Sequence, residues 1–133
     1  MTGHTVTSFD DDLEHIDRLL REMSGLAGAM VQAATQALLA PDGALAQRVV
    51  SDDLLLDARQ RDLDERAIAL IAKRQPMAQD LRAVVSAIRM AADIERIGDH
   101  VTNIAEKAYY AMTGMQPPQH RPKLDETSLT PAQ

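Results

Sequence analysis

The feature that most constrains the fold is an apolar repeat near the start of the chain, with alternating spacings of three and four residues. Residues at these spacings form one stripe along an α-helix, and a stripe of this length is typical of helices that pack in bundles. Ser8, with Asp11 three residues later, resembles a capping box and predicts that this helix begins there. The stripe consists of Leu13, Ile16, Leu20, Met23, Ala27, Met30, Ala34 and Ala37.

Two more stretches carry helical apolar patterns, and helix breakers at 41–43 and at Pro76 separate the three stretches. Asp42 is expected to cap the second helix, and Pro76 to occupy the first turn of the third, which should end between Met112 and Gly114. Core positions expected in the second helix are Val49, Leu56, Leu63, Ala67 and Leu70. Those expected in the third are Leu81, Val84, Ile88, Ala91, Ile94, Gly98, Val101, Ala105 and Ala108.

Composition supports an all-α fold. Apolar residues make up 45% of the 133 residues and aromatic residues only 2%, so small aliphatic side chains must form the core, as in helical bundles and unlike β-sandwiches. The sequence therefore predicts an antiparallel three-helix bundle over residues 8–113. Residues 1–7 are predicted to be a disordered N-terminus, and residues 114–133 a Pro-rich linker or tail.

Charge and residue usage exclude several classes of function. A net charge of −6 and a pI near 5.1 argue against nucleic acid as a partner, because phosphate backbones require a basic surface. The absence of cysteine excludes disulfides and thiolate metal sites. No apolar run approaches the roughly 18 residues of a membrane span, and no signal-peptide pattern is present, so we expect a cytoplasmic protein that meets membranes only through partners. No catalytic motif is found, so no catalytic residue is expected.

Four acidic residues are placed symmetrically about Pro76. Asp57 and Glu95 are equally distant from this proline along the chain, and so are Asp53 and Asp99. In an antiparallel hairpin that bends at the proline, equal distances mean equal heights, since each helix rises about 1.5 Å per residue. Asp53 also occupies a seam position, where a carboxylate costs free energy unless it is paired or bound to a cation.

These spacings predict a metal site formed by Asp53, Asp57, Glu95 and Asp99. Ligand sets made only of oxygen favour hard or borderline ions such as Mg²⁺, Mn²⁺, Ca²⁺ or iron. The alternative is that the carboxylates are solvated, which is the commoner fate of acidic pairs spaced four apart on helices. The Glu-x-x-His signature of di-iron carboxylate bundles is missing, which disfavours oxygen chemistry.

The remaining charged residues are interpreted as surface features. Arginines recur every seven residues along the third helix and form a basic stripe. They are expected to pair with acidic residues of neighbouring helices, with anion binding as the alternative. This stripe consists of Arg82, Arg89 and Arg96. Acidic residues expected to be solvated are Asp62, Asp64 and Glu65.

Two motifs resemble the PhoU family of phosphate-signalling regulators. They are Gln-Pro-x-Ala-x-Asp-Leu-Arg over residues 75–82 and Glu-Arg-Ile-Gly-Asp over residues 95–99, and they are specific in combination and at this separation. The likeness covers about residues 8–113. It implies a three-helix unit and metal clusters held by paired Glu/Asp-x-x-x-Asp motifs. Asp53 with Asp57, and Glu95 with Asp99, match those motif positions.

The resemblance also implies a role. PhoU-like proteins are cytoplasmic adaptors, not enzymes, that restrain a phosphate-responsive sensor histidine kinase and the ATPase of the phosphate ABC transporter when phosphate is plentiful. Many self-associate, so a homo-oligomer such as a homodimer is expected, with iron, manganese or magnesium as the metal. Family members usually carry two tandem units, whereas each motif occurs once here, which predicts the N-terminal half of such a protein or a single-unit relative.

A histidine phosphotransfer module is the alternative function, with His15 or His100 as the phosphoacceptor. The size, acidity and helical content fit, and Arg96 lies one helical turn before His100. The nearby carboxylates would repel a phosphoryl group, and histidines in such positions are more often surface residues. A third interpretation is a self-associating helical fragment with no function of its own.

Overall fold

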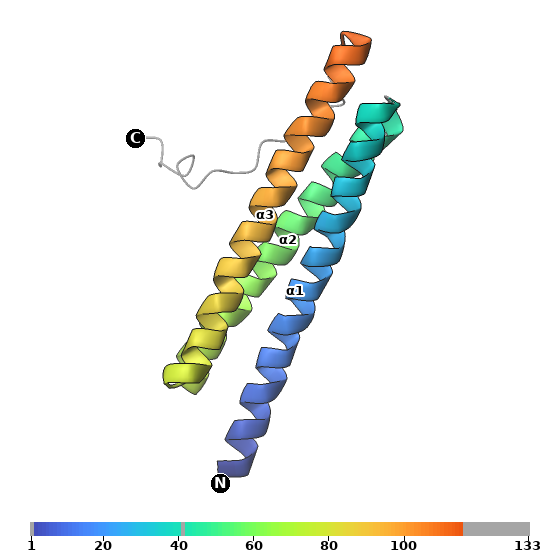
Figure 1. Cartoon of the computed structure of the whole chain (residues 1–133). Helices are drawn as coiled ribbons and strands as arrows, with labels where there is room; N and C mark the ends of the chain where they lie inside the picture. The colour runs from blue at the N-terminus through green and yellow to red at the C-terminus, as the bar shows by residue number, and fades with distance from the viewer. Residues whose placement is uncertain (1, 41, 116–133) are drawn as a thin grey trace, which may run out of the picture.

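Three long helices make up the described part of the chain. A computed structural model describes the backbone over residues 2–40 and 42–115 and the side chains over 8–40 and 42–115. α1 spans Thr2–Leu39, α2 spans Gly43–Arg74 and α3 spans Ala78–Thr113, and each helix packs against the other two (Figure 1). The predicted all-α three-helix bundle is confirmed. None of the described helices has an apolar stretch that could cross a membrane.

The ends of α2 are set by local signals. The carboxylate of Asp42 accepts a hydrogen bond of 2.9 Å from the backbone N–H of Ala44, so the predicted N-cap is confirmed. At the other end, Gln75 has a left-handed backbone with φ of 46°, and its N–H donates to the carbonyl oxygen of Ile71 at 3.0 Å. This left-handed cap ends α2 and begins the chain reversal.

The turn between α2 and α3 differs from the prediction. α3 begins at Ala78 with the extended residue Met77 as its N-cap, so Pro76 precedes the helix and does not lie in its first turn. Proline has no N–H to donate, so it fits this non-helical segment. Ala78 has φ of 30°, a region that residues with a side chain rarely adopt.

The helix start predicted at Ser8 is wrong, since α1 begins at Thr2. No proline occurs before residue 41, and a helix that has formed extends at little cost until it meets a breaker. α3 ends at Thr113, as predicted, with Gly114 in a left-handed C-cap at φ of 69°. Residues 116–133 of the predicted linker lie outside the described residues.

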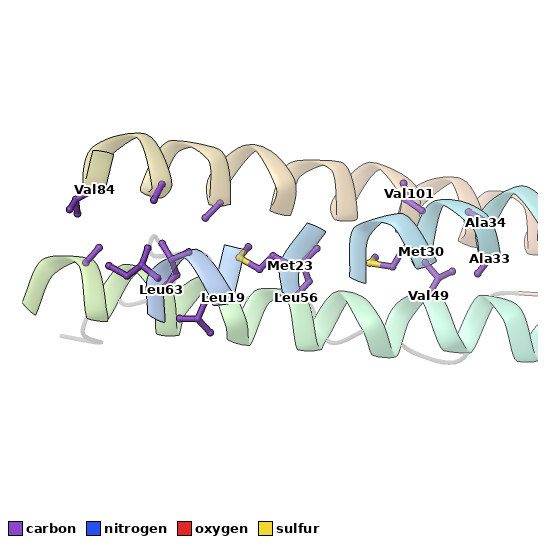
Figure 2. Packing of buried hydrophobic residues seen from close by; sticks show 14 of the residues in the cluster. Leu19, Met23, Met30, Ala33, Ala34, Val49, Leu56, Leu63, Val84 and Val101 are labelled. Atoms are coloured by element: carbon purple, nitrogen blue, oxygen red, sulfur yellow. The ribbon is translucent and has the colours of Figure 1, made fainter. Parts of the chain in front are cut away.

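Small and aliphatic side chains fill the axis of the bundle. Met23, Met30, Val49 and Leu56 are fully buried, and Figure 2 shows them in the space between the helices. All five core positions predicted for α2 are buried. Leu81 is exposed, so its predicted core position is wrong, because it lies in the first turns of α3 beside the chain reversal.

Glycines at the α2–α3 interface reveal the register of the hairpin. A Cβ atom built on Gly43 would lie 3.1 Å from the ring of Tyr109, and these residues are equally distant from Pro76 along the chain. A Cβ atom built on Gly98 would lie 3.0 Å from Oδ1 of Asp53, again at nearly equal distances from the proline. The predicted register about Pro76 is therefore confirmed.

Candidate functional site

Asp53 lies inside the bundle. It is only 1% exposed and is one of two polar residues buried in the described core, with Thr102 of α3 as the other. It occupies the seam of α2 among apolar neighbours, as the sequence predicted. Thr102 donates its hydroxyl proton to the carbonyl oxygen of Gly98, one turn earlier on α3, at 2.8 Å.

Gly98 makes room for the buried carboxylate. A Cβ atom at this position would lie 2.5 Å from a methyl group of Leu56 and 3.0 Å from the carboxylate of Asp53, with Met30 of α1 at 3.5 Å. A Cβ atom here would crowd two side chains of α2, whereas its approach to Met30 is ordinary van der Waals contact. The glycine of the second motif is therefore required by the close approach of the backbone to Asp53.

The other three predicted metal ligands lie at the same level and are partly buried. Asp57 forms an ion pair of 3.3 Å with Arg61, one turn later on α2, and its side chain is 21% exposed. Glu95 and Asp99 of α3 are each half-buried. The equal heights of the acidic pairs follow from the confirmed register.

The four carboxylates do not form a metal-binding arrangement in this structure. Within the described side chains, no group of three or more His, Asp or Glu residues is arranged to hold a metal ion. The donor chemistry fits a hard cation, since carboxylate oxygens from both helices lie at one level. The metal site formed by Asp53, Asp57, Glu95 and Asp99 therefore stays a prediction.

A cavity between α1 and α2 is a second candidate site, and the sequence did not predict it. We call it the α1–α2 cavity; its volume is about 350 Å³. The residues recur at helical spacings on both helices, which is the only signal that could have suggested it. They are Asp11, Asp12, His15 and Arg18 of α1, with Arg66, Ala69, Leu70 and Lys73 of α2.

The two histidines proposed as phosphoacceptors are in different environments. His15 is half-buried and lines the α1–α2 cavity, whereas His100 is exposed on α3. Arg96, the basic group expected to assist His100, forms an ion pair of 3.3 Å with Asp93 on its own helix. The basic stripe on α3 is exposed, but this pairing is within the helix and not with a neighbour as expected.

Ion pairs between helices join α1 to α2. Arg59 pairs with Glu22 at 3.0 Å, and Arg74 pairs with Asp12 at 3.4 Å. All four side chains are partly exposed, so each pair contributes at most about 1 kcal/mol. These pairs bridge α1 and α2 close to the α1–α2 cavity.

Asp64 is not the solvated residue that the sequence suggested. Its Oδ1 atom is buried and has no hydrogen-bond partner among the described residues, and burial raises the pKa of this carboxyl above its ordinary value. Asp64 lies one heptad after Asp57, at the edge of the seam. Oε1 of Glu106 on α3 is likewise buried with no such partner.

Comparison with known proteins identifies the family. Residues 20–108 match the PhoU domain. The chain belongs to the PhoU family. It is 49% identical over 105 residues to a phosphate-specific transport system accessory protein PhoU homolog of Rhizobium meliloti. The matched residues make up 79% of this chain and 44% of that protein. The PhoU motifs at 75–82 and 95–99 therefore mark a true member of the family.

Other PhoU relatives give the same result. The PhoU homolog of Caulobacter vibrioides is 42% identical over 108 residues, 81% of this chain and 47% of that protein. PhoU homolog 2 of Mycobacterium tuberculosis is 42% identical over 106 residues, 77% of this chain and 50% of that protein. The chain thus spans about half the length of the curated relatives it matches. No solved structure gives a significant match.

Proposed function

We propose that the chain is a unit of a non-catalytic, cytoplasmic accessory regulator of phosphate transport. The observation that carries this proposal is the 49% identity to a protein named as an accessory of a phosphate-specific transport system. The partners that this role implies are the ATPase of the phosphate ABC transporter and a phosphate-responsive sensor histidine kinase. Phosphotransfer through His15 or His100 is not favoured, because the relatives are named as transport accessory proteins.

Binding to the ATPase tests this role. The 133-residue chain should copurify with the ATPase subunit of the phosphate transporter, and an ATPase from an unrelated ABC transporter is the control. The chain should also restore repression of a phosphate-starvation reporter in bacteria that lack their own PhoU protein. Failure to bind together with failure to repress would contradict the proposal. Light scattering of the purified chain tests the expected homo-oligomer.

Metal binding by Asp53, Asp57, Glu95 and Asp99 is a second part of the proposal. Its support is that acidic side chains of α2 and α3 lie at one level, with Asp53 buried. A bound cation would offset the repulsion among these carboxylates. The residues would thereby tie α2 to α3, and so stabilise the surface that the bundle presents to partners.

Thermal melts with added Mn²⁺, Fe³⁺ or Mg²⁺ test the metal site. At a metal concentration about a hundred times Kd, we expect Tm to rise by about 10 °C. Replacing one carboxylate on each helix, in Asp53→Asn with Asp99→Asn, should abolish that rise. The matched control is Asp52→Asn with Asp93→Asn, which removes the same charges beside the site. A Tm that no metal changes would refute this part and leave the regulatory role intact.

A further inference from the structure

The α1–α2 cavity has a charge opposite to that of the whole chain. Its lining contains three permanent cations, Arg18, Arg66 and Lys73, together with His15. It also contains the carboxylates of Asp11 and Asp12. Asp12 is paired with Arg74 at 3.4 Å and Arg66 with Asp62 at 3.0 Å, which leaves Arg18 and Lys73 opposite Asp11. The chain as a whole carries −6. A basic cavity on an acidic protein attracts anions locally.

The basic groups reach the cavity from both helices. Arg18 comes from α1, and Lys73 and Arg66 come from α2. Arg66 also bonds to Asp62 through its Nε at 3.0 Å, which fixes the orientation of its side chain. Neither Arg18 nor Lys73 forms an ion pair with any described residue, so both ammonium and guanidinium donors are available to a ligand.

The shape of the cavity suits a small molecule. Its volume of about 350 Å³ falls in the range of about 300–1,000 Å³ that is typical of ligand pockets. Only Ala69 and Leu70 of its lining are apolar, and Leu70 is 2% exposed, so the lining is mostly polar. A ligand would therefore find a polar cavity with cations from two helices.

We propose that the α1–α2 cavity binds a phosphate-bearing small anion. The guanidinium of Arg18 is suited to two parallel hydrogen bonds to phosphate oxygens, and the ammonium of Lys73 supplies a point charge. His15 donates a further hydrogen bond from the same wall as Arg18. The ligand is either inorganic phosphate or pyrophosphate, or a nucleotide that binds through its phosphate groups. This inference goes beyond the proposed regulatory role and does not depend on it.

Isothermal titration of the full 133-residue chain tests the proposal. The probes are inorganic phosphate, pyrophosphate, ADP and ATP, with citrate as a polyanion that lacks phosphorus. We expect one of the phosphate probes to bind more tightly than citrate by about tenfold or more, and to weaken as salt is added. Preference among the probes separates the inorganic source from the nucleotide source.

Matched variants localise the binding. Arg18→Gln with Lys73→Gln should weaken binding by at least about tenfold. Arg82→Gln with Arg89→Gln changes the net charge equally on the exposed face of α3, and should leave affinity unchanged. Circular dichroism melts establish that both variants fold. Equal affinity in the two variants, binding of citrate as tight as that of phosphate, or no binding up to about 10 mM would each overturn the proposal.

Discussion

α2 contacts its two neighbours in opposite ways. Toward α3 it buries the carboxylate of Asp53 against Gly98, where a Cβ atom would be crowded. Toward the N-terminal half of α1 it leaves an open cavity bordered by long charged side chains. The difference shows that one helix can carry a tightly packed acidic interface and an open basic one. Gly98 permits the close approach of α3, whereas the Arg and Lys residues beside the cavity are exposed at the edge of α2.

The largest expected effect is at the packed interface. Leu56→Ala removes a fully buried side chain that contacts the Gly98 region, and should lower the free energy of unfolding by about 2–5 kcal/mol. Its neighbour Leu55 is 40% exposed, so Leu55→Ala should cost less than about 1 kcal/mol. Chemical denaturation of the two variants measures both values. Similar losses would mean that the packing of α2 against α3 is not as tight as described.

A glycine pair tests the close approach directly. Alanine normally stabilises a helix by about 1 kcal/mol relative to glycine, and Gly28→Ala should show this gain because nothing lies within 4 Å of its Cβ position. Gly98→Ala should instead destabilise the bundle by about 1–2 kcal/mol, since its Cβ would overlap Leu56 and Asp53. Opposite signs in urea denaturation support the packed interface. A gain for both variants would contradict it.

The packed interface was the part that sequence could predict. α2 and α3 form a hairpin with a short turn, so counting residues from Pro76 gives their relative height, as the contact of Gly43 with Tyr109 shows. The apolar seam and the burial of Asp53 follow from helical periodicity. The direction in which each carboxylate points depends on its rotamer, and spacing does not determine a rotamer. The spacing therefore placed the four acidic residues at one level but did not determine whether their side chains converge.

The open interface could not be predicted for a different reason. An apolar seam repeats every turn or two, so sliding α1 along α2 by one repeat preserves most apolar contacts. The level that brings Arg18 beside Arg66 is therefore not encoded by the seam alone. The sequence predicted a solvated Asp64, but one of its oxygens is buried. Asp64 lies beside the seam, where a small rotation of the helix about its axis changes whether a side chain is exposed or buried.

Asp64→Asn should stabilise the bundle at neutral pH by about 1 kcal/mol or less, since it removes a charge from a partly buried site. The folded pKa is raised, so the ionised carboxyl destabilises the folded state at pH values above it. This cost fades as pH falls through the folded pKa and is absent below the unfolded value near 3.8. Denaturation across this pH range should show the gain disappearing. Glu65→Gln, on the exposed neighbour, should show no such gain at neutral pH.

The smallest expected effect is at the border of the α1–α2 cavity, where Arg74 and Asp12 are 3.4 Å apart and partly exposed. A double-mutant cycle of Asp12→Asn and Arg74→Gln should give a coupling of about 0.2–1 kcal/mol that decreases as salt is added. The same cycle on Asp93 and Arg96, which pair within α3 and are about 70% exposed, is the control and should give less. A coupling well above 1 kcal/mol would mean that this edge is drier than its exposure indicates. In that case the contrast between the two interfaces of α2 would be one of degree only.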